Sequence, residues 1–194
     1  MKSIRTRLLV NFTFIVIVTV VILEALILNV VRQNYYKNLE NNLYNQVKMS
    51  ADFYEKYFSD STLQDNVLNN VDTFWRQTSA QVQILDENGK LLMDSIGLIP
   101  EDDSENYIFE DVKEALKGSK GSWIGKVNYD DDRVMAVSHP LKSGEKIEGV
   151  LRFITSLRQI NEDIDEIAEI FILIGAAVII ISCVISVFQA NAIL

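Results

Sequence analysis

The apolar residues of this chain gather in two blocks that flank a segment of mixed composition. The first block runs from Leu8 to Leu28 and the second from Ile170 to Phe188. At about 1.5 Å rise per residue, a helix of about 20 residues crosses a hydrocarbon core of about 30 Å. The pattern therefore predicts two transmembrane helices, over residues 8–31 and 170–188.

A cleaved signal peptide is the alternative for the first block, because it also begins with positive residues followed by an apolar stretch. The apolar block exceeds the usual length of about 7 to 15 residues, and no small-x-small cleavage pattern closes it. We therefore expect a retained membrane helix. Glu24 is the one charge inside it, and we expect its carboxylate to snorkel to the outer interface, the alternative being a buried functional site.

After the first block the apolar positions take a helical period. They are spaced three or four residues apart, at Tyr36, Leu39, Leu43, Val47, Ala51, Tyr54 and Phe58. Neither Pro nor Gly occurs between residues 8 and 58, so the first span is expected to continue outward as one helix. A capping box at Ser61 and Gln64 predicts a second helix that ends near Thr78.

From Gln81 the period shifts toward two, which predicts strands. Asn88-Gly89 lies between two apolar runs and predicts a hairpin over residues 81–93. A short helix is expected around Val112, with Gly118 at its C′ position. Three further strands are predicted at 123–127, 133–138 and 147–157. Hairpin connections favour an α+β fold with an antiparallel sheet and helices on one face.

The positive residues before the first span set the expected orientation. Lys2, Arg5 and Arg7 crowd residues 1–7, which should stay cytoplasmic by the positive-inside rule. Both termini are then expected inside the cell and residues 32–169 outside, in a two-pass protein of the plasma membrane.

The central segment is strongly acidic. It carries 26 of 27 carboxylates but only 15 of 18 Lys and Arg, so 15 − 26 leaves a formal charge of −11. Such a domain repels nucleic acid, which we exclude as a partner. The single cysteine, Cys183, falls in the second span, so the central domain has no disulfide and depends on an apolar core.

Three segments carry a resemblance to a known family. Residues 86–95 (DENGKLLMDS) are similar to its D-x-x-G-x-(apolar)2-x-D-S hairpin, and residues 111–118 (DVKEALKG) to its (E/D)-(apolar)-x-x-A-L-x-G helix. Residues 149–157 (GVLRFITSL) are similar to the final strand that feeds the second span. In this order between two spans, they resemble the input half of a Gram-positive type sensor histidine kinase with an extracytoplasmic PAS-like domain of the Cache class.

The resemblance implies a single Cache domain with a long N-terminal helix, a homodimer in the lipid bilayer, an unknown extracytoplasmic ligand and no cofactor. In the family a HAMP linker and a kinase domain follow the second span. Residues 189–194 would begin that linker, so we expect the sensor part of a longer protein or a truncated copy. Two alternatives remain, the sensor half of a chemoreceptor or diguanylate cyclase, and a non-signalling membrane-anchored binding protein.

Three residues are candidates for ligand binding. Arg133 and His139 are expected to share one face of a strand, and Arg152 lies on the adjacent final strand. In PAS-like domains a cation that points into the pocket often meets a carboxylate ligand, and an imidazole with a pKa near about 6.5 could report acidity. The alternatives are solvated arginines and a histidine at a strand end.

Acidic clusters at Asp130, Asp131 and Asp132 and at residues 101–103 are weak candidates for a divalent cation, since oxygen ligands suit hard cations. Solvated loops are the alternative, and we assign no metal site. The sequence holds no recognisable catalytic triad, zinc motif or phosphate loop, so this chain is not expected to be an enzyme.

Overall fold

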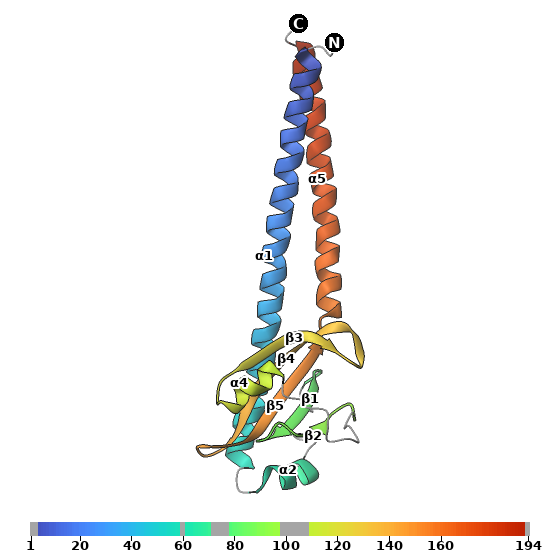
Figure 1. The fold of residues 1–194 in the computed structure, drawn as a ribbon. Helices are drawn as coiled ribbons and strands as arrows, with labels where there is room; N and C mark the ends of the chain where they lie inside the picture. The colour runs from blue at the N-terminus through green and yellow to red at the C-terminus, as the bar shows by residue number, and fades with distance from the viewer. Residues whose placement is uncertain (1–3, 59–60, 71–77, 98–108, 193–194) are drawn as a thin grey trace. The chain divides into compact units, whose positions relative to one another are not determined.

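The computed structural model describes residues 4–58, 61–70, 78–97 and 109–192. The chain forms two compact units, one of Met1–Tyr36 with Gln159–Leu194 and one of Lys37–Arg158. Helix α1 (Ile4–Tyr57) begins in the first unit and ends in the second (Figure 1).

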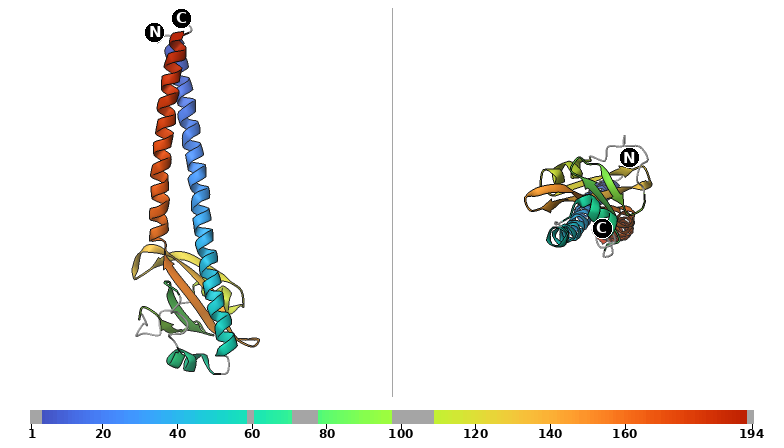
Figure 2. Two further views of the ribbon diagram at one scale, coloured as in Figure 1. Left: turned by 180° about the vertical axis from the view of Figure 1, so that it is seen from behind. Right: turned by 90° about the horizontal axis from the view of Figure 1, so that it is seen from below.

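The first unit is an antiparallel pair of helices, formed by the N-terminal part of α1 and by α5 (Arg158–Ala192), which lie side by side (Figure 2). The Tyr36 hydroxyl donates a hydrogen bond to Asn161 Oδ1 over 2.9 Å. Further along the pair, Thr13 Oγ1 lies 3.9 Å from Cys183 Sγ. Polar side chains therefore join the two helices at both ends of the pair.

Between these contacts, Gly175 of α5 leaves room for Glu24 of α1. A Cβ at position 175 would lie 2.9 Å from Glu24 Cδ and 2.9 Å from Val20 Cγ1. The Glu24 carboxylate is thus packed against the neighbouring helix, whereas the sequence predicts that it snorkels to an interface.

Both helices are long and apolar enough to cross a membrane. The segments concerned are Val10–Tyr57 and Arg158–Phe188. In the most apolar stretch of each segment, only 0% and 11% of the residues are buried. Outward-facing side chains such as Phe14 and Leu173 are 65% and 71% exposed. These helices expose their apolar surface instead of burying it in a protein core, and they flank the second unit as the sequence predicts.

The second unit contains an antiparallel sheet with strand order β2-β1-β5-β4-β3. The strands are β1 (Gln81–Asp86), β2 (Leu91–Asp94), β3 (Gly121–Val127), β4 (Asp130–Ser143) and β5 (Lys146–Ser156). The predicted α+β class is confirmed. Strand β4 extends past its predicted end and includes Pro140. The last β3–β4 pair is Gly121 with Ser138, so no residue of β3 lies opposite Pro140. The missing N–H of this proline therefore removes no hydrogen bond from the sheet.

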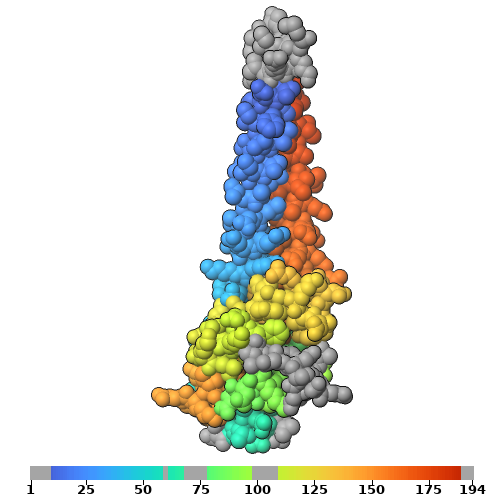
Figure 3. Space-filling view, viewed as in Figure 1, coloured from blue at the N-terminus to red at the C-terminus, as the bar shows by residue number. Residues whose placement is uncertain are grey.

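Helices cover both faces of this sheet. The C-terminal part of α1 lies on one face and α4 (Glu110–Leu116) on the other (Figures 1 and 2), and Figure 3 shows α4 in yellow-green over the strands. The prediction of helices on one face is therefore wrong. In β5 all of residues 149–154 are buried, whereas a strand with one solvated face would show alternating buried and exposed residues. The side chains on both faces are buried because a helix covers each face.

Strand β5 contains a β-bulge. Leu141 pairs with Gly149 but Lys142 pairs with Ile147, so Glu148 is the extra residue. The bulge turns Glu148 toward α1, where the Tyr54 hydroxyl donates a hydrogen bond to Glu148 Oε2 over 2.9 Å.

The turns and helix ends follow the sequence closely. Gly89 and Gly118 have φ angles of 81° and 89°, as the predicted hairpin turn and helix C′ position require. Helix α2 (Leu63–Asn70) begins one residue later than predicted, because Thr62 Oγ1 accepts the Asp65 N–H over 3.2 Å and donates to its carboxylate. The rest of the predicted second helix, residues 71–77, lies outside the described residues.

Tyr54 predicts a loss of stability at alkaline pH. Burial raises its pKa from 10.0 to about 12, with a further contribution from Glu148. Because the pKa of Tyr54 is higher in the folded state than in the unfolded state, the protonated hydroxyl contributes fully to the free energy of unfolding below pH 10. This contribution of Tyr54 is lost as the pH rises toward 12. Denaturant unfolding of the full chain at pH 9 to 12 should show a smaller alkaline loss in Tyr54→Phe. Tyr57→Phe, on the exposed side of the same helix, is the control and should keep the wild-type profile, whereas equal profiles for Tyr54→Phe and wild type would contradict the assignment.

Candidate functional site

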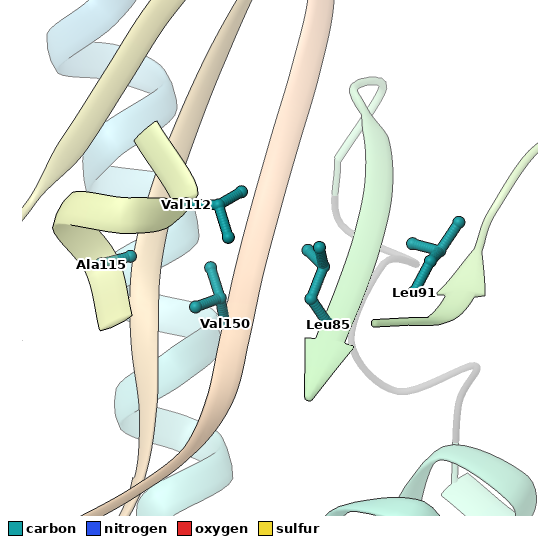
Figure 4. Packing of buried hydrophobic residues seen from close by; sticks show 5 residues of the cluster. All are labelled: Leu85, Leu91, Val112, Ala115 and Val150. Atoms are coloured by element: carbon teal, nitrogen blue, oxygen red, sulfur yellow. The ribbon is translucent and has the colours of Figure 1, made fainter. Parts of the chain in front are cut away.

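The sheet face beneath α4, called here the α4 face, is polar at its centre and apolar on both sides. In the strand register Arg152 lies opposite Gln83 on one neighbouring strand and opposite Ser138 on the other, so the three side chains share this face. One apolar flank joins strands to α4 through Leu85, Leu91, Val112, Ala115 and Val150 (Figure 4). The other flank comprises Trp123, Val127, Val134, Ala136 and Ile154.

The centre of the α4 face is a buried ion pair. Arg152 Nε donates to Asp111 Oδ2 over 2.7 Å, and Arg152 Nη2 donates to Asp111 Oδ1 over 3.3 Å. The two side chains are 1% and 0% exposed. This two-point geometry matches the fork of a guanidinium to a carboxylate, the arrangement in which such a pair is strongest.

Asp111 reaches the sheet because α4 lies unusually close to β3. A Cβ at Gly121 would lie 2.6 Å from Asp111 Cα, closer than real Cβ atoms approach. Only glycine at position 121 lets the first turn of α4 lie directly on the strand. The Ser138 hydroxyl then donates to Asp111 Oδ2 over 2.7 Å, so this oxygen accepts two hydrogen bonds.

Two aromatic rings lie against the Arg152 guanidinium. Its Cζ is 4.5 Å from the centroid of Phe109 and 5.7 Å from that of Trp123, and the two ring centroids are 4.7 Å apart. Gly125 makes room for the indole, because a Cβ there would lie 2.5 Å from Trp123 Cη2. Cation–π attraction adds to the ion pair at distances below about 6 Å.

A second carboxylate is joined to Arg152 through amide side chains. Arg152 Nη1 donates to Gln83 Oε1 over 3.0 Å, and Gln83 Nε2 donates to Asp94 Oδ2 over 2.7 Å. Gln81 Nε2 donates to both Asp94 oxygens at 3.0 and 2.9 Å, and the Tyr129 hydroxyl donates to Gln81 Oε1 at 2.9 Å. We call this network the polar cluster, and its members are Gln81, Gln83, Asp94, Asp111, Ser138 and Arg152.

The polar cluster is satisfied in hydrogen bonds but unbalanced in charge. Every buried side-chain nitrogen and oxygen among the described residues has a partner. Asp94 and Asp111 supply two carboxylates, whereas Arg152 supplies the one cation of the cluster. Partial burial raises the pKa of Tyr129, and the charge of Asp94 adds to the rise. The cluster therefore carries a formal charge of −1 inside an apolar surround.

The three predicted ligand residues do not come together. Arg152 lies at the centre of the polar cluster, but Arg133 and His139 have the opposite parity along β4 and face the side of α1. Arg133 is exposed. His139 is half-buried, with its ring centroid 5.9 Å from that of Tyr44 and its Nδ1 3.0 Å from the Pro140 carbonyl oxygen.

Sequence reasoning missed the partners of Arg152. Asp111 lies in a helix segment that the sequence did identify, but its pairing depends on a contact 41 positions along the chain. The alternation of Gln81 and Gln83 with Val82 and Ile84 was a usable signal, since both sides of β1 are covered and its polar positions must therefore meet polar partners.

The acidic metal candidates are not assembled into a site. Asp132 N–H donates to Asp130 Oδ1 over 2.9 Å in a tight turn, and the Asp132 carboxylate lies 3.7 Å from Arg158 Nε at the surface. Among the described residues no group of three or more His, Cys, Asp or Glu side chains is placed to hold a metal ion. Residues 101–103 lie outside the described residues.

Comparisons with known proteins bear on the fold. No protein-family model and no curated protein sequence matches the chain. The ligand-binding domain of the Campylobacter jejuni chemoreceptor Tlp3 in complex with L-valine is 18% identical with a TM-score of 0.56, over 81% of this chain and 66% of that chain. Its complex with L-norvaline gives 20% identity and a TM-score of 0.54, over 86% and 64%. The Escherichia coli DcuS sensor domain is 13% identical with a TM-score of 0.48, over 65% and 97%.

At these identities the likeness to Tlp3 concerns the fold alone. The α+β unit with its five-stranded antiparallel sheet and long N-terminal helix has the fold of a sensory domain. The chain spans about two thirds of the length of the Tlp3 domains, with coverage of 66% and 64%.

The buried ion pair predicts strong coupling between its partners. Arg152→Gln or Asp111→Asn alone should lower the free energy of unfolding by about 3 to 5 kcal/mol, because each leaves a buried charge unpaired. The double variant should lose less than the sum of the two, with a coupling free energy of about 1 to 3 kcal/mol in a double-mutant cycle from denaturant unfolding of the full chain.

The matched control for this cycle is the pair Lys117 and Glu114 on α4, which is 2.6 Å apart but 65% and 40% exposed. A double-mutant cycle with Lys117→Gln and Glu114→Gln should give a coupling free energy close to zero, because solvent screens exposed ion pairs. Additive losses at Arg152 and Asp111 would contradict the assignment of a mutually dependent pair.

Proposed function

We propose that this chain is the extracytoplasmic sensor and membrane-spanning input module of a two-component histidine kinase. The observation that carries the proposal is the continuity between a sensory-type fold and two apolar helices. Helix α1 runs without interruption from Ile4 to Tyr57, and α5 begins at Arg158, directly after β5 ends at Ser156. Both ends of the sheet domain are thus covalently continuous with an apolar helix.

The two apolar helices cross the plasma membrane in this proposal. Their exposed apolar side chains need a hydrocarbon surround, since a contiguous apolar surface of this kind is unfavourable in water. Lys2, Arg5 and Arg7 favour a cytoplasmic N-terminus, which puts the acidic sheet domain outside the cell and the C-terminus inside.

The polar cluster is the proposed place of ligand recognition. Specific small-molecule sites combine an apolar surround with a few polar groups, and the α4 face has this composition. The similar Tlp3 domains are described in complex with L-valine and L-norvaline. A small organic ligand whose charge or polar groups engage the polar cluster is therefore the proposed stimulus.

The signal passes by rearrangement of helices in a homodimer, and this chain itself performs no catalysis and needs no cofactor. A ligand can shift such an equilibrium only through its differential affinity for the two states, typically about 1 to 3 kcal/mol. The kinase activity belongs to a cytoplasmic domain downstream of α5, as in the family that the sequence resembles.

The second candidate is the sensor half of a chemoreceptor or diguanylate cyclase, and the likeness to Tlp3 favours the chemoreceptor. These alternatives share the same outer domain and membrane helices and differ in their cytoplasmic output. A non-signalling membrane-anchored binding protein is the third candidate, and it differs in having no ligand-dependent change in its membrane helices.

The proposal predicts selective stabilisation by one class of small molecule. Thermal unfolding of the full chain in detergent should show a raised midpoint with one class among carboxylates, amino acids, peptides and divalent cations, since a ligand at about 100 times its Kd adds about 2.7 kcal/mol. Arg152→Gln should abolish the shift, and Lys126→Gln at an exposed position of β3 should keep it. A flat response across the panel would count against small-molecule sensing and favour sensing of a partner protein or of the membrane itself.

A further inference from the structure

Arg152 is the one cation of the polar cluster, yet protein groups already occupy it. Asp111 takes the edge formed by Nε and Nη2, and Gln83 accepts from Nη1. The centroid of the Phe109 ring lies 4.5 Å from Arg152 Cζ, and the Arg152 side chain is 1% exposed. An external anion therefore meets an Arg152 whose carboxylate-binding edge is filled.

The charge of the polar cluster prevents a second anion from simply joining the first. Asp94 and Asp111 already give two carboxylates for one guanidinium, and both are buried, at 6% and 0% exposure. A third carboxylate would raise the formal charge from −1 to −2 in surroundings that screen charge poorly, which is strongly unfavourable. An entering carboxylate must take the place of one already present.

Asp111 is the carboxylate that can leave. It belongs to the seven-residue helix α4, which also contacts the sheet through the apolar side chains of Val112, Ala115 and Leu116 and through the close approach of the Asp111 backbone to Gly121. Asp94, in contrast, lies within β2 and is held by Gln81, Gln83 and the Ile96 N–H. Breaking the Asp111 contact requires movement of only a short helix, whereas breaking that of Asp94 disrupts a strand.

A movement of α4 has a direct route to α1 within the same unit. The segment after α4 ends at Lys120, whose Nζ lies 2.6 Å from Glu40 Oε1 and 4.7 Å from the centroid of the Tyr44 ring. Glu40 and Tyr44 belong to α1. The next residue is Gly121, which contacts the backbone of Asp111. Lys120 and Gly121 thus connect the Asp111–Arg152 ion pair to α1, which continues into the apolar N-terminal segment.

We propose that Asp111 is a built-in competitor for the ligand: a small carboxylate binds Arg152 in place of the Asp111 carboxylate and thereby frees α4 from the sheet. This inference rests on the proposed sensory function and specifies the chemistry of its site. In the absence of ligand, Asp111 holds α4 against the sheet. With ligand, the guanidinium keeps a carboxylate partner, and α4 keeps only its apolar contacts.

The first experiment tests whether a free carboxylate can bind Arg152 in the space that the Asp111 carboxylate occupies. In the full chain in detergent, Asp111→Ala opens this place, and sodium acetate should raise the thermal unfolding midpoint of the variant. Acetamide, which has the same shape without the charge, should not raise it at matched ionic strength. The double variant Asp111→Ala, Arg152→Gln should lose the response, because the cation that binds acetate is gone.

The second experiment uses the unaltered chain, so it holds even if the variants fold poorly. Hydrogen exchange at the amides of residues 112–116 is measured with acetate, propionate, succinate and L-valine as probes. A carboxylate that displaces Asp111 should speed exchange in α4 by at least about fivefold, in the range of typical coupling between sites. Exchange in β1, residues 81–86, is the internal control and should stay unchanged.

Rescue by acetate together with faster exchange in α4 supports the inference. Absence of rescue in a folded Asp111→Ala chain overturns it, because the Asp111 place then does not take a carboxylate. Unchanged exchange in α4 with every probe also overturns it. If the midpoint of the wild-type chain rises only with a class that contains no carboxylate, this inference is wrong and the sensory function stands.

Discussion

The second unit is organised around a buried cation. Arg152 lies in the middle of the central strand β5, and a guanidinium in that position is tolerated only if a carboxylate and several acceptors meet it. Asp111 supplies the charge, Gln83 accepts a further hydrogen bond, and glycine at position 121 allows α4 close enough for the pairing. The position of α4 on the sheet thus follows from the electrostatic requirement of a single side chain.

The two faces of the sheet differ in composition. On the side of α1, the sheet meets an apolar helical stripe that includes Leu43, Val47 and Ala51, all at most 4% exposed. On the side of α4, a polar centre interrupts two apolar clusters. A polar network in an apolar surround responds strongly to any change in its charge, and for this reason the α4 face is the proposed recognition surface.

Local patterns in the sequence predict the elements of this fold but not their long-range pairing. The two apolar blocks, the Asn88-Gly89 turn and the C′ glycine at position 118 depend on neighbours within a few residues, and the structure confirms all of them. The facing of the helices, the bulge at Glu148 and the pairing of Arg152 with Asp111 depend on contacts between distant segments. Arg152 could be singled out as a cation on the last strand, but nothing local to it indicates which carboxylate it meets.

In the proposed function, a change of state in the sheet domain alters the arrangement of α1 and α5, and a disulfide between these two helices would report such a change. Thr13 Oγ1 lies 3.9 Å from Cys183 Sγ, so Thr13→Cys in the full chain in lipid bilayers should form a disulfide with the native cysteine under mild oxidant. A ligand that stabilises the sheet domain is expected to change the rate of this cross-link, and Arg152→Gln is expected to remove the change. An identical rate with and without a bound ligand would show that the sheet domain does not act on α1 and α5.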